Sequence, residues 1–224
     1  MASPEHAKTS AASPDHAEEA REPARRPRMR CLAIGRAFLR NPTQIGAIAP
    51  SSAVLAECIT SEIDIERAGS VVEYGVGTGV FTRAILRKLA PGASYCGFEI
   101  DPELALRFRH DFPGVNLSTE DVAHAPRVLA EAGIAGADCI VSGLPWAAFP
   151  EQTQRRILAG TMAILSPTGH FATFAYLQGV ILPAGKRFRR LLDEHFAVVQ
   201  RSRIVWRNLP PAFVYRCREP LAQA

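Results

Sequence analysis

Short apolar runs and longer amphipathic segments alternate along residues 61–218. Runs rich in β-branched and aromatic residues predict buried strands, and segments with apolar positions three or four residues apart predict helices. The strands expected on this basis are 71–74, 95–99, 115–118, 138–142, 170–176, 198–205 and 212–217. The helices expected are 53–63, 81–89, 102–112, 125–132, 152–165 and 186–196. This alternation predicts an α/β fold, with a seven-stranded, mostly parallel sheet, helices on both faces and an antiparallel C-terminal hairpin.

The chain before residue 61 has a different pattern. Residues 1–27 contain few large apolar side chains, so we expect a flexible tail there. Residues 28–60 are expected to form an amphipathic segment that also provides a lid, and 61–218 the main domain. In this segment Arg36 and Arg40 are one helical turn apart. Such a basic segment can lie on an anionic membrane surface, and it can equally cover the domain core with its arginines in solvent.

A glycine-rich turn follows the first predicted strand, in the stretch VVEYGVGTGVFTRAIL. Gly75, Gly77 and Gly79 follow an acid, Glu73, and precede a helix, which is the order of a Rossmann-like nucleotide site. The dinucleotide fingerprint would need a glycine in place of Val80, and the Gly-Lys-Ser/Thr of a phosphate-binding loop is absent. The pattern E-x-G-x-G-x-G resembles motif I of class I S-adenosylmethionine (SAM) methyltransferases, whose ligand carries an amine that suits a nearby carboxylate. A structural turn without a ligand is the alternative.

Two further acids follow predicted strands at the spacing of such a site. Glu99 ends the second strand, where an acid accepts hydrogen bonds from ribose hydroxyls. Glu120-Asp121-Val122 follows the third strand, and in these methyltransferases the acid at this place binds the adenine amino group. A lone acid after a strand is more often a helix cap, so the inference depends on the acids occurring together. The cofactor-binding residues expected are Glu73, Tyr74, Gly75, Gly77, Thr78, Gly79, Glu99, Ile100, Glu120, Asp121, Val122, Ser142, Gly143 and Leu144.

The fourth predicted strand ends in the segment Ser142-Gly143-Leu144-Pro145-Trp146. In open α/β sheets, ligands gather beyond such strand ends. Trp146 has a flat face that can attract a cationic amine or the SAM sulfonium, or stack on a base. A partly buried core residue is the commonest alternative for a tryptophan. The segment resembles the N-P-P-Y or N-L-P-Y motif of amino-group methyltransferases, but Ser142-Gly143 replaces the asparagine, which weakens a base-methylating function.

Several segments together resemble the bacterial phospholipid N-methyltransferases, which are related to the rRNA adenine dimethyltransferases. They are Phe38-Leu39 with IGAIAPSS after it, motif I, SGLPW, and the ending WRNLPPAFVY. The resemblance implies SAM-dependent methylation of phosphatidylethanolamine to its mono-, di- and trimethylated forms. It implies that Tyr176 and Trp146 are catalytic, with Tyr176 accepting or orienting the amine proton. It also implies that the acceptor is bound by Ile48, Pro50, Ser51, Pro145, Trp146, Arg207 and Asn208. Further candidates for the lipid phosphate are Arg187, Arg189 and Arg190, for which solvated helix arginines are the alternative.

Composition adds limits to this interpretation. The chain has 224 residues, a net charge of +4 and a pI near 9.0. This mild basicity fits an amino-phospholipid substrate and an anionic membrane surface, and we expect no nucleic acid partner. The five cysteines form no C-x-x-C pair, so neither a metal site nor a disulfide framework is expected. A polar N-terminus without a long apolar run predicts a cytoplasmic protein, peripherally associated with the inner face of the membrane. Methylation of rRNA adenine or of a soluble small molecule is the alternative function.

Overall fold

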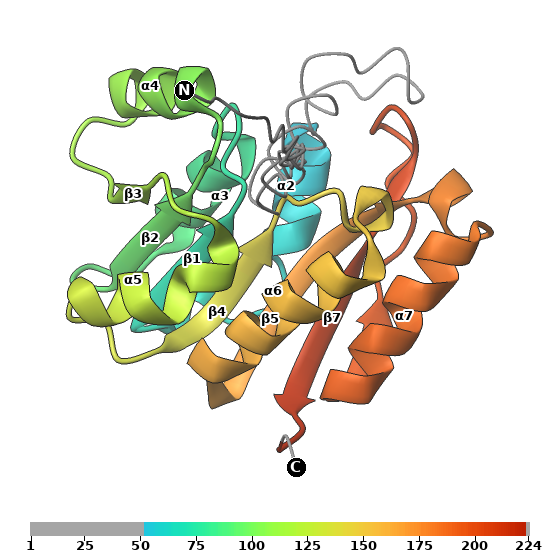
Figure 1. Cartoon of the computed structure of the whole chain (residues 1–224). Coiled ribbons are helices and arrows are strands. Elements are labelled where there is room, and N and C mark those ends of the chain that lie inside the picture. The colour runs from blue at the N-terminus through green and yellow to red at the C-terminus, as the bar shows by residue number, and fades with distance from the viewer. Residues whose placement is uncertain (1–51, 223–224) are drawn as a thin grey trace, which may run out of the picture.

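The computed structural model describes residues 52–222, which form a sheet between two layers of helices (Figure 1). The helices are α2 (Ala53–Thr60), α3 (Val80–Lys88), α4 (Pro102–Asp111), α5 (Ala125–Glu131), α6 (Glu151–Ile164) and α7 (Pro183–His195). The strands are β1 (Ser70–Tyr74), β2 (Ser94–Phe98), β3 (Leu117–Ser118), β4 (Ala137–Ser142), β5 (Leu165–Tyr176), β6 (Phe196–Arg201) and β7 (Ala212–Pro220). Short 3-10 helices connect them: η1 (Ile65–Arg67), η2 (Val122–His124), η3 (Trp146–Ala148) and η4 (Leu177–Gly179).

The seven strands form one sheet in the order β3-β2-β1-β4-β5-β7-β6. β1 pairs in parallel with β2 and β4, whereas β7 is antiparallel to both of its neighbours, β5 and β6. The predicted fold class and its C-terminal hairpin are therefore confirmed. The strand order reverses between β1 and β4, and open α/β sheets bind ligands in the crevice beyond the strand ends at such a point.

Two strand boundaries differ from the prediction. β5 begins at Leu165 rather than at 170, because Leu165 pairs with Ala137 ahead of a register shift between β4 and β5. The sequence Ser-Pro-Thr-Gly within this stretch is typical of a turn and conceals the longer strand. β6 is 196–201 rather than 198–205, since Val205 forms only an isolated bridge to Ala212. The connection 202–211 therefore leaves the sheet.

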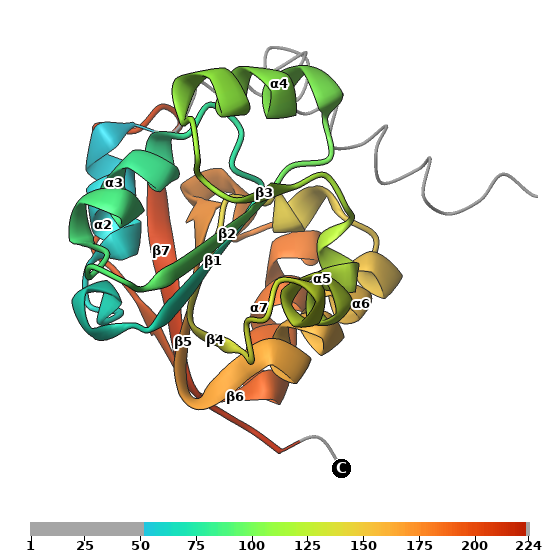
Figure 2. The same ribbon diagram turned by 90° about the vertical axis from the view of Figure 1, so that its left-hand side faces the viewer.

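Helices cover both faces of the sheet, as predicted (Figure 2). α2 and α3 lie on one face, and α5, α6 and α7 lie on the other. Each face has its own apolar core: Leu55, Phe81 and Ile85 belong to the first, and Phe171 and Leu192 to the second. This two-sided burial explains why apolar residues dominate the central strands on both faces.

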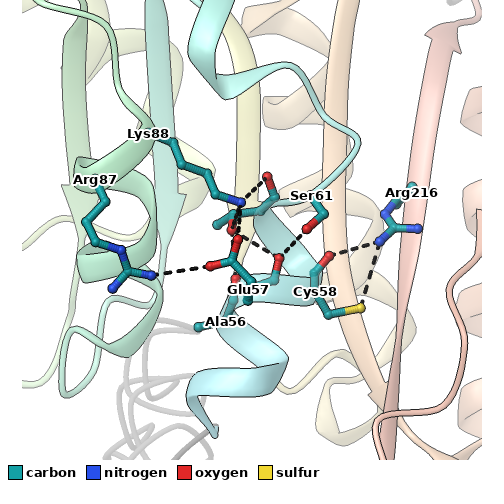
Figure 3. A network of polar contacts seen from close by, with 8 residues as sticks. Ala56, Glu57, Cys58, Ser61, Arg87, Lys88 and Arg216 are labelled. Carbon is teal, nitrogen blue, oxygen red and sulfur yellow. Dashed lines mark hydrogen bonds and ion pairs between the residues drawn. The ribbon is translucent and has the colours of Figure 1, made fainter.

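Polar contacts hold α2 against α3 and β7 (Figure 3). Lys88 Nζ on α3 lies 2.6 Å from Glu57 Oε1, and the Arg216 guanidinium on β7 donates to the Cys58 carbonyl oxygen at 3.0 Å. The apolar face of the helix is buried through Leu55, Ala56 and Ile59. Residues 53–60, which the sequence analysis placed with the N-terminal lid segment, thus pack as part of the domain core.

Candidate active site

The turn between β1 and α3 has a left-handed backbone at three glycines. The φ angle is +72° at Gly75, +52° at Gly77 and +74° at Gly79, a region that other residues rarely adopt. The amides of Gly75 and Val76 donate to the Phe98 carbonyl oxygen at 2.9 and 3.1 Å, which fastens the turn to the end of β2. The turn leads into the N-terminus of α3, where backbone amides are free to bind a ligand.

Gly143 brings the end of β4 against this turn. Its amide donates to the Tyr74 carbonyl oxygen at 2.7 Å, and a Cβ atom at position 143 would stand 2.8 Å from the Gly75 carbonyl oxygen. A Cβ atom on Gly75 would in turn stand 3.0 Å from the Leu144 side chain. The contact is so close that both positions need glycine. We call this paired structure, Gly75–Gly79 with Gly143 and Leu144, the glycine rim.

The carboxylate of Glu99 is held beside the glycine rim. Its Oε2 accepts a hydrogen bond from the Gly77 amide at 3.0 Å, and its Oε1 accepts one from the Asp101 amide at 2.9 Å. Burial raises the pKa of Glu99, and the bonds from the two amides act in the opposite direction. An oriented carboxylate next to the turn is the placement that the sequence predicts for a ribose ligand.

Glu73, by contrast, does not reach the surface of the rim. The residue is fully buried, and its Oε2 accepts hydrogen bonds from the Thr82 hydroxyl at 2.8 Å and the Tyr95 hydroxyl at 2.6 Å. Burial raises its pKa to about 8. Side chains alternate faces along a strand, and this one points between α3 and β2. Glu73 therefore lies beneath the turn in this structure, and its contact with the methionine end of SAM stays a prediction.

The third predicted acid follows the neighbouring strand. The Glu99 amide donates to the Ser118 carbonyl oxygen at 3.0 Å, so β3 ends next to β2. Asp121 caps η2 through the Ala123 amide at 2.9 Å and pairs with Arg156 at 2.9 Å. The helix cap named as the alternative is thus present, and a contact with adenine stays a prediction. Of the other residues expected here, Tyr74 and Val122 are buried, and Thr78, Ile100 and Glu120 are half-buried.

Trp146 is a core residue in this structure. Only 2% of its surface is exposed, and its ring stacks on Phe188 with the ring centroids 4.7 Å apart. The indole N–H donates to the Ser142 hydroxyl at 3.0 Å, and the amide side chain of Gln154 donates to the Trp146 carbonyl oxygen at 2.6 Å. Trp146 is therefore packed in the core over most of its surface, which is the alternative that the sequence left open. The Ser142 hydroxyl orients its indole ring.

A cavity of about 70 Å³ lies beyond the ends of β4 and β5. Leu144 and Pro145 connect it to the glycine rim, and its aromatic walls are Trp146, Phe174, Phe188 and Tyr215. Tyr176 also lines it, and the buried Tyr176 hydroxyl has no hydrogen-bond partner among residues 52–222. Burial raises the pKa of Tyr176, so the hydroxyl keeps its proton at neutral pH. The cavity can hold an uncharged amine between aromatic walls, with a hydroxyl available to orient it.

The predicted acceptor-binding residues are divided between loop and core. Arg207 is exposed in the connection 202–211. Asn208 is buried, and both ends of its amide group are bonded: Oδ1 accepts from the Ser52 amide at 2.9 Å, and Nδ2 donates to the Pro210 carbonyl oxygen at 2.7 Å. Asn208 thus ties this connection to the start of α2. Three further residues of the set lie outside the described residues: Ile48, Pro50 and Ser51.

The arginines of α7 differ in their surroundings. Arg187 lies 3.8 Å from Glu151 on α6, and Arg189 pairs with Asp193 one turn along its own helix. Both side chains are only 27% exposed, and the Arg189 guanidinium lies 5.8 Å from the centre of the Tyr215 ring. Arg190 is exposed. A contact of these arginines with the lipid phosphate stays a prediction.

Some site residues were not predicted from the sequence. Phe174 and Tyr176 are two residues apart on β5, and their ring centroids are 5.2 Å apart, so the period of a strand could have indicated Phe174. Phe188 comes from α7, and nothing in the local pattern shows that it faces Trp146. Thr82 and Tyr95, which hold Glu73, are likewise visible only in three dimensions.

Between residues 52 and 222, no three His, Cys, Asp or Glu side chains are grouped so that they could hold a metal ion. Over the same residues, no helix is both long and apolar enough to span a bilayer.

The glycine rim fits SAM. Three left-handed glycines leave the turn with few side chains, Gly143 allows a second loop to close on it, and Glu99 presents a fixed carboxylate at the adjacent strand end. Solved methyltransferases share the fold. The O-methyltransferase of Bacillus cereus in complex with SAH matches with a TM-score of 0.61 at 13% identity, over 84% of this chain and 90% of that chain. TomG of Streptomyces achromogenes, an O-methyltransferase in complex with SAM, matches with 0.59 at 14% identity, over 84% and 88%.

The fold and the rim define a class I SAM-dependent methyltransferase, and SAM is its methyl donor. No protein-family model matches the chain. A curated protein named ornithine lipid N-methyltransferase, from Singulisphaera acidiphila, is 34% identical over 184 residues, which is 81% of this chain and 92% of the relative. The chain belongs to the family of this lipid N-methyltransferase.

Proposed function

We propose that this protein methylates the amine of a membrane lipid head group. The observation that carries the proposal is the 34% identity, over most of both chains, to a protein named as a lipid N-methyltransferase. The aromatic cavity next to the glycine rim supports it, because an amine acceptor needs a desolvated position beside the methyl donor. SAM supplies an activated methyl group, and the residues of the chain supply alignment.

The cofactor side of the site is the glycine rim with Glu99. Backbone amides of the turn receive the methionine end, and the Glu99 carboxylate receives the ribose hydroxyls. Asp121 follows β3, and we propose that its carboxylate contacts the adenine amino group.

The acceptor side is the cavity. A primary ammonium must lose its proton before it can attack a methyl group, and burial among aromatic walls lowers the pKa of an amine. The Tyr176 hydroxyl is too firmly protonated to remove that proton as tyrosinate. It therefore orients the neutral amine by accepting a hydrogen bond, and the proton leaves to solvent before the amine is enclosed.

Two lipid acceptors fit this chemistry. Phosphatidylethanolamine, methylated in up to three steps, is the acceptor that the sequence resemblance implies, and we propose it first. Ornithine lipid is the second candidate, because the 34% identical relative carries that name. Both lipids require the enzyme to work at a membrane surface, which we place at the cytoplasmic face.

The test is methyl transfer from radiolabelled SAM to several acceptors in parallel: phosphatidylethanolamine vesicles, ornithine lipid vesicles, bulk rRNA and soluble amines. We expect label in a lipid fraction, lost in Glu99→Ala, which removes the proposed ribose contact. Label confined to RNA or to soluble amines would contradict a lipid acceptor and leave the SAM site intact. The ratio of label in the two lipids decides between the two candidates.

A further inference from the structure

Two connections at the carboxyl end of β5 carry exposed apolar side chains. They are the segment after β5 and the connection between β6 and β7, and the Leu177 amide of the first donates to the Pro211 carbonyl oxygen of the second at 2.9 Å. Six of the nine large apolar side chains exposed within residues 52–222 belong to them. We call these six the apolar lip: Leu177, Ile181, Leu182, Ile204, Trp206 and Leu209.

The lip is concentrated and well exposed. Ile181 is 74% exposed, Trp206 65% and Leu209 70%, values that a folded protein tolerates singly but seldom as a group. Figure 1 shows both connections at one end of the molecule, beyond the end of β5 and beside the start of α7. Asn208 anchors the second connection to the start of α2 through two partly buried hydrogen bonds.

The charges around the lip have one sign. The two connections that carry the lip, residues 177–182 and 202–211, contain two arginines and no aspartate or glutamate. These arginines, Arg203 and Arg207, are exposed in the second connection. Exposed apolar side chains with arginines beside them match an anionic lipid interface, where acyl chains and phosphates meet.

The lip continues into the proposed active site. Gly179 and Val180, which lie between Leu177 and Ile181 in the chain, line the cavity together with Tyr176. One short segment therefore has apolar residues in solvent and others against the cavity.

We propose that the apolar lip docks the protein onto an anionic bilayer, so that the cavity receives lipid head groups directly from the surface. Trp206, Leu209 and Ile181 enter the interfacial region of the bilayer, and Arg203 and Arg207 meet lipid phosphates. The inference rests on the proposed function and deepens it, because it assigns the surface through which the lipid acceptor is reached. It also places bilayer binding within the described domain, apart from the basic segment 28–40.

Tryptophan fluorescence tests the docking directly. The chain has two tryptophans, of which Trp146 is 2% exposed and Trp206 is 65% exposed, so a change of polarity on binding reports on Trp206. With vesicles of equal parts phosphatidylethanolamine and phosphatidylglycerol, we expect a blue shift of the emission and quenching by brominated acyl chains. Trp206→Phe should remove both signals while the vesicles still sediment with the protein.

A second measurement compares variants. Trp206→Ser combined with Leu209→Ser should weaken vesicle binding at least about tenfold, from the loss of buried apolar surface. Leu106→Ser is the matched control, because Leu106 is 71% exposed but lies on α4, outside the lip. Circular dichroism confirms that each variant is folded. Equal binding by the double variant and the control would overturn the proposal.

Two other results would also overturn it. If vesicles bind the protein but Trp206 emission does not change, another part of the chain makes the contact. If the emission shifts with protein concentration in the absence of vesicles, the lip is a self-association surface.

Methyl transfer to a monomeric short-chain acceptor separates this proposal from the proposed function. The lip variants should retain that activity, whereas a wild-type protein without any lipid methylation would contradict the function and leave the docking result standing.

Discussion

Glu73 is a carboxylic acid placed where water does not reach it. Its Oε2 is bonded to Tyr95 and Thr82, and its Oε1 has no partner within the described structure. Burial raises its pKa from 4.5 to about 8, because a charged form would lose its hydration. At neutral pH the folded protein therefore holds a protonated carboxyl beneath the glycine rim, with the two hydroxyls as donors to one oxygen.

This shift has a consequence for stability. Between pH 4.5 and about 8 the unfolded chain has released the Glu73 proton and the folded chain has kept it. Stability must then fall as pH rises through this window, with a slope of up to about 1.4 kcal/mol per pH unit from this group. Glu73→Gln keeps an oxygen to accept from Tyr95 and Thr82 and removes the titration. We expect chemical denaturation to show a flatter pH profile in this variant and a stability gain above pH 8.

Glu57→Gln is the control for that measurement. The Glu57 pKa is lowered, first by its hydrogen bond to Lys88, so its contribution is lost only as pH falls below its usual range. The slope between pH 5 and 8 should be the same as in the unmodified protein. A Glu73→Gln profile that runs parallel to the unmodified protein would show that Glu73 is ionised in the fold.

Tyr176 is the residue through which the cavity is expected to act on the amine. Tyr176→Phe removes the unpartnered hydroxyl and keeps the aromatic wall. We expect kcat for the lipid acceptor to fall about tenfold, the loss of a single orienting hydrogen bond, with little change in SAM affinity. Tyr215→Phe is the comparison. Tyr215 lines the same cavity, but its hydroxyl is not among the buried polar atoms that lack a hydrogen-bond partner within residues 52–222. Equal effects in both variants would remove Tyr176 from the mechanism.

At the scale of elements, the turn from β1 to α3 is the part most sensitive to substitution. A Cβ atom on Gly79 would overlap the ring of Phe112, which stacks on Phe108 and has the Arg83 guanidinium 4.9 Å from its centre. Gly79→Ala therefore combines left-handed backbone strain with a steric overlap, and we expect a loss of about 2 to 4 kcal/mol in the free energy of unfolding.

Gly114→Ala separates these two contributions. Gly114 has a φ angle of +81°, as left-handed as that of Gly79, but a Cβ atom there would meet nothing within 4 Å. We expect it to lower stability by about 1 kcal/mol, the backbone strain alone. Thermal or urea denaturation of both variants gives the comparison, and equal losses would show that Phe112 moves aside without cost.

The sequence predicts features that depend on local spacing better than features that depend on contacts between elements. Periodicity identified all seven strands and the helices between them, because each buries a face that depends on local spacing. Strand boundaries that depend on pairing were less accessible. β5 begins earlier than predicted because Leu165 pairs with Ala137 ahead of a register shift, and β6 ends earlier because Val205 forms only an isolated bridge. The sequence identified Glu73 before the turn but not the orientation of its side chain, because that depends on Thr82 and Tyr95 from two other elements.

At the scale of the whole molecule, charge and apolar surface gather where the parallel strands end. The net charge of +4 is modest, yet the two connections that carry the lip, residues 177–182 and 202–211, have arginines as their only charged side chains. The exposure of the Asn-Leu-Pro-Pro stretch depends on how residues 202–211 leave the sheet, which the local sequence pattern does not show. Distribution of charge therefore indicates more about the partner than the total does.

This distribution makes the lipid reaction sensitive to salt. Attraction between exposed arginines and lipid phosphates is screened within about 8 Å at physiological ionic strength, and more strongly above it. Raising salt from about 50 to about 500 mM should reduce the initial rate on anionic vesicles about tenfold or more, since each arginine near the surface contributes about 1 kcal/mol. The rate on a monomeric short-chain acceptor should change little, because its encounter needs no bilayer. Arg203→Gln with Arg207→Gln should reproduce the high-salt rate at low salt. If both acceptors lose rate in parallel, salt acts on the cavity or on SAM binding, and the arginines of the lip have no part in reaching the membrane.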